Sequence, residues 1–117
     1  MPVIHAIVRG TEKKAMLALD LHGRDLCRIL AEVSGYNVAD ICLIPRILTQ
    51  REEMYSHNFP LIHLDIDLGI RPDHIGDETA ELIVNKLSQK CPGFSEIHFT
   101  VWLKQHKHNG SAEHRHG

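Results

Sequence analysis

The sequence predicts an α+β domain with the element order β-α-β-β-α-β, in which a four-stranded mixed sheet carries two helices on one face. Two observations lead to this fold class. Two strand–helix–strand patterns follow each other along the 117 residues, a length typical of one domain. In addition, Pro2-Val3-Ile4-His5 recurs 58 residues later as Pro60-Leu61-Ile62-His63, and each copy opens a predicted strand. This recurrence predicts an internal pseudo-twofold repeat.

The first unit begins with a strand and continues into a long helix. Residues 3–9 are apolar and β-branched, which is typical of a strand, and Gly10 ends it. Thr11 is placed to cap a helix that runs to about Val33, and Gly35 follows as a helix stop. A strand–helix–strand unit of this length makes a right-handed parallel crossover, so the next strand is expected to run parallel to the first.

The strand that completes the first unit is predicted at residues 40–48. Pro45 has no N–H to donate to a neighbouring strand, so this strand is expected at a sheet edge or with a bulge. The polar residues 49–59 form the connection to the second unit.

The second unit repeats this order. Residues 61–68 alternate apolar with polar side chains, which predicts a strand with one apolar face. A helix follows and ends near Cys91, and residues 96–104 alternate in the same way. The stretch 105–117 is polar and rich in histidine, so we expect a domain over residues 1–104 followed by a flexible or partner-docked tail.

Composition excludes several classes of protein. The 13 basic and 15 acidic residues give a net charge of −2, without the basic excess of a nucleic-acid binder. No apolar run approaches the ~18 residues of a membrane span, and no signal segment opens the chain. The three cysteines Cys27, Cys42 and Cys91 form no close pair, which predicts reduced thiols and a cytoplasmic location.

Pro2 carries the first functional hypothesis. Met before a small residue such as Pro is normally removed, which leaves a secondary amine at the start of a strand. That amine is a candidate base if an apolar pocket disfavours its ammonium form. If Met1 stays, the Pro2 nitrogen is an amide and cannot act as a base. The structural alternative is that Pro2 only starts a strand.

A domain of this order that opens with Pro2 and contains an internal repeat resembles the tautomerase superfamily. That superfamily includes the 4-oxalocrotonate tautomerases, the carboxymethyl-hydroxymuconate isomerases and macrophage migration inhibitory factor. The resemblance covers residues 2 to about 104. The segment Phe59-Pro60-Leu61-Ile62-His63-Leu64, with the distal Asn109-Gly110 and His114, is most similar to a branch of bacterial tautomerase-like proteins.

The resemblance implies a chemistry and an assembly. Family members use the amino-terminal proline as a base that moves a proton between the oxygen and carbon of an enol, and that role falls on Pro2. They form trimers whose sheets face a common centre, so a homotrimer is expected, with the pocket near a subunit boundary. The expected substrate is a small enol or keto acid, and no cofactor or metal is expected.

Family members also place a cation to hold a substrate carboxylate. Arg71, with its neighbour Ile70, is the first choice, because it precedes the second helix, whose positive end favours anions. A solvated loop charge beside Asp73 is the alternative role for Arg71. Arg46 and Arg9 are further candidates.

Tyr36 is the candidate for a second polar group. It follows the helix stop at Gly35, where relatives similar to the inhibitory factor carry a lysine. Its hydroxyl could donate a hydrogen bond to a substrate, and a surface ring without a role is the alternative.

Histidines on the predicted sheet give a hypothesis of another class. His5, His63 and His98 are expected on one sheet face with Asp65 and Asp67, a donor set that suits zinc or another transition metal. No His pair has the helical spacing of many metal sites. The favoured alternative is that this polar face is buried between subunits and that its histidines pair with the aspartates.

The leading functional prediction is therefore a tautomerase that uses Pro2 as base. The rival prediction is a non-catalytic oligomeric module of the same fold that binds a ligand or a protein.

Overall fold

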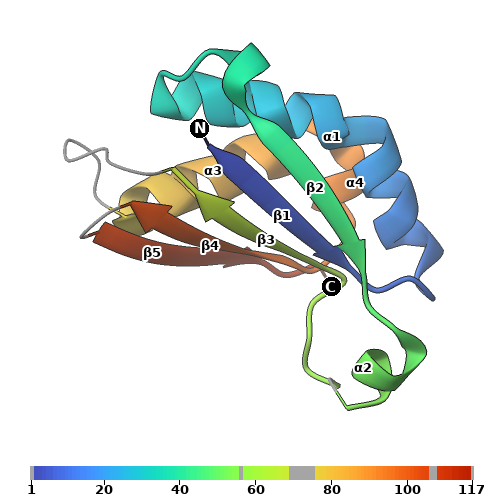
Figure 1. Ribbon diagram of the computed structural model, residues 1–117. Helices are drawn as coiled ribbons and strands as arrows, with labels where there is room; N and C mark the ends of the chain where they lie inside the picture. Colours follow the sequence, from blue (N-terminus) through green and yellow to red (C-terminus); the bar gives the residue numbers. More distant parts are fainter. Residues whose placement is uncertain (1, 56, 69–75, 106–107, 117) are drawn as a thin grey trace.

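The computed structural model describes residues 2–55, 57–68, 76–105 and 108–116 (Figure 1). Its elements follow the predicted order, with additions that are described below. They are β1 (Val3–Val8), α1 (Lys13–Ser34), the 3-10 helix η1 (Val38–Asp40), β2 (Cys42–Ile47), α2 (Gln50–Met54), β3 (Ile62–Asp67), α3 (Gly76–Lys90), α4 (Pro92–Ser95), β4 (Phe99–Gln105) and β5 (His108–His114).

The sheet has the order β2-β1-β3-β4-β5. Its parallel pairs are β1 with β2 and β3 with β4, and the two units meet where β1 runs antiparallel to β3. Fully buried side chains recur at the 58-residue offset of the sequence repeat: Ile4, Ala6 and Val8 match Ile62, Leu64 and Ile66. The predicted β-α-β repeat is confirmed. Strand β2 lies at the sheet edge, as expected from Pro45.

The prediction of four strands was wrong, because β5 adds a fifth. Strand β5 occupies part of the polar stretch 105–117 and pairs antiparallel with β4. It buries small residues: Gly110 is buried and Ala112 packs against the core. A Cβ at Gly110 would overlap the backbone of Gly76 at the start of α3. Such a strand has no large apolar side chains whose alternation would reveal it.

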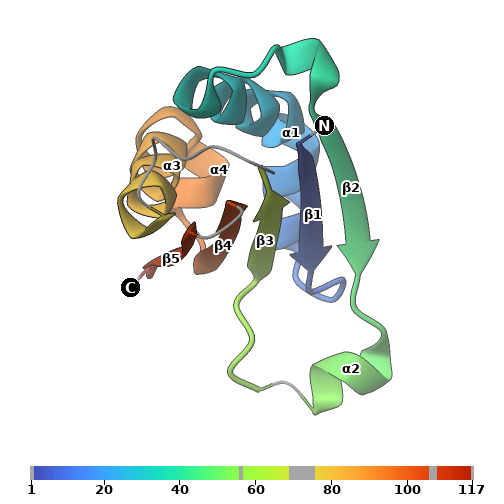
Figure 2. The ribbon, with the colours of Figure 1, turned by 60° about the vertical axis from the view of Figure 1, so that its left-hand side comes forward.

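The helices form a layer on one face of the sheet (Figures 1 and 2). Helices α1 and α3 are the two that were predicted, and the short α4 packs beside both. The described chain adds a second short helix, α2, which lies beyond the end of the sheet in the connection between β2 and β3 (Figure 2). Gly35 ends α1 with a positive φ of 77°, a conformation in which glycine has no steric penalty.

None of the described helices lies over the opposite face of the sheet (Figure 2). It carries a mixture of polar and apolar side chains, among them His5 and Ile7 from β1, Ile44 from β2, His63 from β3 and Trp102 from β4. Ile44 is 42% exposed and Trp102 is 37% exposed. We refer to this side of the sheet as the open face. No helix in the described ranges has both the length and the apolar character needed to cross a bilayer.

Candidate functional site

Pro2 lies directly before β1 and is buried. Its carbonyl accepts a hydrogen bond from the backbone N–H of Cys42, at 3.0 Å, which fixes it beside the start of β2. On its other side, the β1–β3 register pairs Val3 with Asp67, so one step further Pro2 stands opposite Leu68. Met1 lies outside the described residues.

Tyr36 reaches the same end of the sheet from the helix layer. Its hydroxyl donates to the carbonyl of Leu68 at 2.9 Å, and Leu68 is the residue that stands opposite Pro2. The turn that aims Tyr36 is held by Ser34, whose hydroxyl donates to the Leu30 carbonyl at 2.6 Å and accepts from the Tyr36 N–H at 3.4 Å. The structure therefore gathers Pro2 and Tyr36 at one end of the sheet.

Ile70 and Arg71, the first choices for binding substrate, lie outside the described residues. They follow Leu68 by two and three residues in the sequence. Leu68, which stands opposite Pro2, is the last described residue before them. Their predicted roles stay predictions.

Arg46 and Arg9 lie toward the other end of the sheet. Arg46 pairs with Ile7, which is five residues along β1 from Pro2, a distance of about 17 Å. Arg9 follows the last residue of β1, and its Nε donates to the Phe59 carbonyl at 3.0 Å. Within one copy of the chain, neither arginine is brought to Pro2.

Arg46 instead borders a hollow of about 490 Å³ between the end of the sheet and α2, with Ile7, Glu52 and Phe59 among its lining residues. Its guanidinium donates to Glu52 Oε2 at 2.6 Å. Thr49 caps α2 by accepting from the Glu52 N–H at 3.1 Å, and the Glu52 carboxylate accepts in return from the Thr49 N–H at 3.0 Å. The Thr49 backbone N–H, together with Arg46, lowers the pKa of Glu52.

Two of the histidines that were considered as metal ligands have other partners. His63 Nδ1 is hydrogen-bonded to Thr100 Oγ1 at 2.6 Å, and His98 Nε2 lies 3.1 Å from Glu113 Oε2. Burial lowers the pKa of the His63 imidazole, and the nearby Asp65 opposes that shift. Among the described residues, none of His5, His63 and His98 belongs to a group of three donors within metal-ligand distance.

Comparisons with known proteins identify the fold. No family model matches the sequence, and no curated protein matches it. Among solved structures, the Q0 fused 4-OT wild-type symmetric trimer matches with a TM-score of 0.50 and 13% identity, over 88% of this chain and 84% of that chain. This chain has the tautomerase fold. The structure of Pt0534 inactivated by 2-oxo-3-pentynoate matches with a TM-score of 0.48 and 16% identity, over 89% of this chain and 83% of that chain.

The resemblance to tautomerases that the sequence indicated is thus confirmed for the fold. At 13% identity, the likeness carries no information about which residues act on a substrate.

One cluster escaped the sequence analysis altogether. His22, Asp25 and Cys91 bring three potential ligand atoms together in the helix layer. The sequence could have indicated two of the three residues, because His22 and Asp25 are three residues apart on a predicted helix and so share a face. Cys91 is 66 residues further along the chain than Asp25, and only the packing of α4 against α1 brings it near.

Proposed function

We propose that this chain is a tautomerase that moves a proton between the enol and keto forms of a small carboxylate-bearing substrate, with the amino group of Pro2 as base. The observation that carries the proposal is the placement of Pro2. It is buried at the start of β1 of a tautomerase fold, at the sheet end where Tyr36 and Leu68 also lie.

The proposed reaction needs only one group that can take and return a proton. In the enol-to-keto direction, the Pro2 nitrogen accepts the proton of the enol hydroxyl while the C=C electrons become available at carbon. The same nitrogen then returns a proton to that carbon, and a C=O bond replaces the C=C bond. Nothing is oxidised or reduced, so the reaction requires no cofactor. Burial favours this role, since a desolvated amine is more readily held in its neutral form.

Two further roles complete the proposal. Arg71, which follows Leu68 by three residues, binds the substrate carboxylate, and Ile70 contributes apolar contact. Tyr36 acts as a positioning residue, because its hydroxyl is already committed to the Leu68 carbonyl at 2.9 Å. It would hold the end of β3, from which the Arg71 segment departs, against the helix layer. Arg46 serves a Pro2 site only if another copy of the chain supplies that proline.

We also propose a homotrimer in the cytoplasm. The open face supports an assembly, because Ile44 and Trp102 expose large apolar side chains beside half-buried Ile7 and His63. The matched 4-OT structure is a symmetric trimer. A trimer that covers the open face would remove these side chains from water.

The test begins with the mass of the purified chain, because only a chain without Met1 has a Pro2 amine. The processed protein is then assayed with a panel of 2-oxo acids, by the loss of enol absorbance and by deuterium uptake at the carbon next to the carbonyl. We expect turnover to fall by at least ~100-fold in Pro2→Ala. We expect Arg71→Ala to raise KM, because it removes the group that binds the substrate carboxylate. Arg24→Ala, which changes an exposed arginine on α1, should have no effect.

A chain extended by a few residues before Pro2 is the sharpest control, since it keeps the proline ring and converts its nitrogen to an amide. Activity that survives this extension would contradict the proposed base. A processed chain with no turnover on any acid of the panel, but with saturable binding of one of them, would favour the non-catalytic binding module instead.

A further inference from the structure

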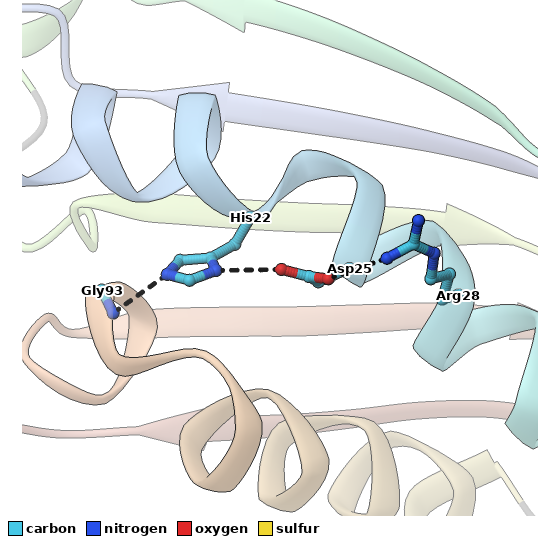
Figure 3. Close-up of polar contacts among 4 residues, drawn as sticks. All are labelled: His22, Asp25, Arg28 and Gly93. Atoms are coloured by element: carbon cyan, nitrogen blue, oxygen red, sulfur yellow. Dashed lines mark hydrogen bonds and ion pairs between the residues drawn. The ribbon is translucent and has the colours of Figure 1, made fainter.

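We propose that His22, Asp25 and Cys91 form a binding site for a thiophilic divalent transition-metal ion of the zinc type. The three side chains meet in the helix layer, where α1 packs against α4. Figure 3 shows His22 and Asp25 on α1, beside Gly93. The site is separate from Pro2: His22 lies twelve residues before the end of α1 at Ser34, about 18 Å along the helix axis.

The spacing of the donor atoms fits one ion. One ligand atom from each residue lies within 4.8 Å of the other two, and His22 Nδ1 is 3.1 Å from Asp25 Oδ2. In a tetrahedral zinc site with bonds of 2.0 to 2.3 Å, two ligand atoms lie roughly 3.3 to 3.8 Å apart. An ion would therefore need these donor atoms to approach one another by no more than about an ångström.

The backbone around the cluster explains why the three residues meet. His22 and Asp25 share one face of α1, and Cys91 stands at the N-cap of α4. Gly93 lets α4 approach closely, because a Cβ at that position would lie 3.1 Å from His22 Cδ2 and 3.2 Å from Ala18 Cα. The close contact between α1 and α4 therefore positions the three donor residues independently of an ion.

Charge and donor chemistry also suit such an ion. Thiolate, imidazole and carboxylate are the ligands that zinc takes in proteins, and one thiolate with one carboxylate balances its two positive charges. Arg28 Nη1 lies 3.4 Å from Asp25 Oδ1, which leaves Oδ2 for the ion while the other oxygen keeps its partner (Figure 3). Cys91 is fully buried, whereas the Asp25 side chain is 41% exposed, so an ion and one water can enter from the Asp25 side.

Both ring nitrogens of His22 have hydrogen-bond partners. The Gly93 N–H donates to His22 Nε2 at 3.4 Å, so Nδ1 carries the proton and donates to Asp25 (Figure 3). Binding through Nδ1 would move that proton to Nε2 and open the contact with Gly93, which at 3.4 Å is already long. Burial raises the pKa of the Cys91 thiol, so binding would release one proton from its sulfur.

The test is a titration of the reduced, metal-free protein with Co²⁺ in the absence of oxygen. The ten histidines of the chain can bind metal nonspecifically, so the readout is the thiolate-to-cobalt charge-transfer absorption, which requires a coordinating cysteine. We expect this absorption to saturate at one ion per chain and to disappear on addition of Zn²⁺.

Matched variants assign the ligands. Cys91→Ser should abolish the absorption, while Cys27→Ser with Cys42→Ser in one chain should retain it. Asp25→Asn, at a partly exposed position that tolerates the change, should weaken cobalt binding by at least ~10-fold. His57→Gln removes an exposed histidine and should change nothing. Absence of the absorption from the wild-type protein, or its survival in Cys91→Ser, would overturn the proposal and leave the cluster as a hydrogen-bonded clamp between α1 and α4.

Discussion

At the scale of single residues, Tyr36 links the helix layer to the sheet end that contains Pro2. Its hydroxyl donates to the Leu68 carbonyl, and its ring packs against the core. Tyr36→Phe keeps the ring and removes this hydrogen bond, so we expect the free energy of unfolding to fall by about 1 kcal/mol. Urea denaturation of both proteins measures the change. Equal denaturation midpoints and slopes for the two proteins would show that the Tyr36 hydroxyl does not stabilise the fold.

His63 makes stability depend on pH. Burial lowers the pKa of its imidazole from 6.5, partly offset by Asp65, so the unfolded chain takes up a proton here more readily than the folded one. Stability from this residue is therefore present above about pH 6.5 and is lost as the pH falls toward the lowered pKa. In His63→Gln, the free energy of unfolding should decline less steeply between about pH 7.5 and 5.

The control for that measurement is His57→Gln, since His57 is exposed in the connection between α2 and β3. It should leave the pH dependence of the wild-type protein unchanged. An unchanged slope in His63→Gln as well would contradict the assignment.

At the scale of elements, β5 depends on a glycine rather than on apolar side chains. Gly110 lies against Gly76 at the start of α3, and the Ser111 N–H donates to Asp77 Oδ1 at 3.1 Å. Gly110→Val should detach β5 from α3 and lower the free energy of unfolding by about 1–3 kcal/mol, the usual cost of overpacking. Amide hydrogen exchange in β5 should become faster.

Ser111→Val is the matched control, because Ser111 is the next residue and is exposed. Valine favours a strand. If both variants exchange at the wild-type rate, the close approach of β5 to α3 is not what holds the strand.

The elements differ in how far the sequence could predict them. Strand β3 shows strict alternation and α1 ends at Gly35, so both followed from local patterns. Strand β5 gains its stability from pairing with β4 and from the contact of Gly110 with Gly76, which are non-local. The residues at the candidate site differ in the same way. The sequence repeat predicts that Pro2 opens the first strand. The hydrogen bond from Tyr36 to Leu68 depends on tertiary packing, which the sequence pattern does not show.

At the scale of the whole molecule, the proposed trimer can be tested by its mass. Three chains of 13.3 kDa would give a particle of about 40 kDa, which light scattering after size exclusion can measure. Ile44→Glu places a charge on the open face and should reduce the mass to that of a monomer. Leu21→Glu changes a leucine that is 70% exposed on α1 and should keep the trimer. A wild-type mass of 13.3 kDa would contradict the proposed assembly.

The proposed function depends on a free amino group at Pro2. The most direct measurement is therefore turnover of 2-oxo acids by two forms of the chain, one processed to begin at Pro2 and one extended before it. Our account predicts deuterium uptake next to the carbonyl in the processed form and none above background in the extended form. Equal uptake in both forms would contradict the account, because the amide nitrogen of the extended chain cannot act as a base.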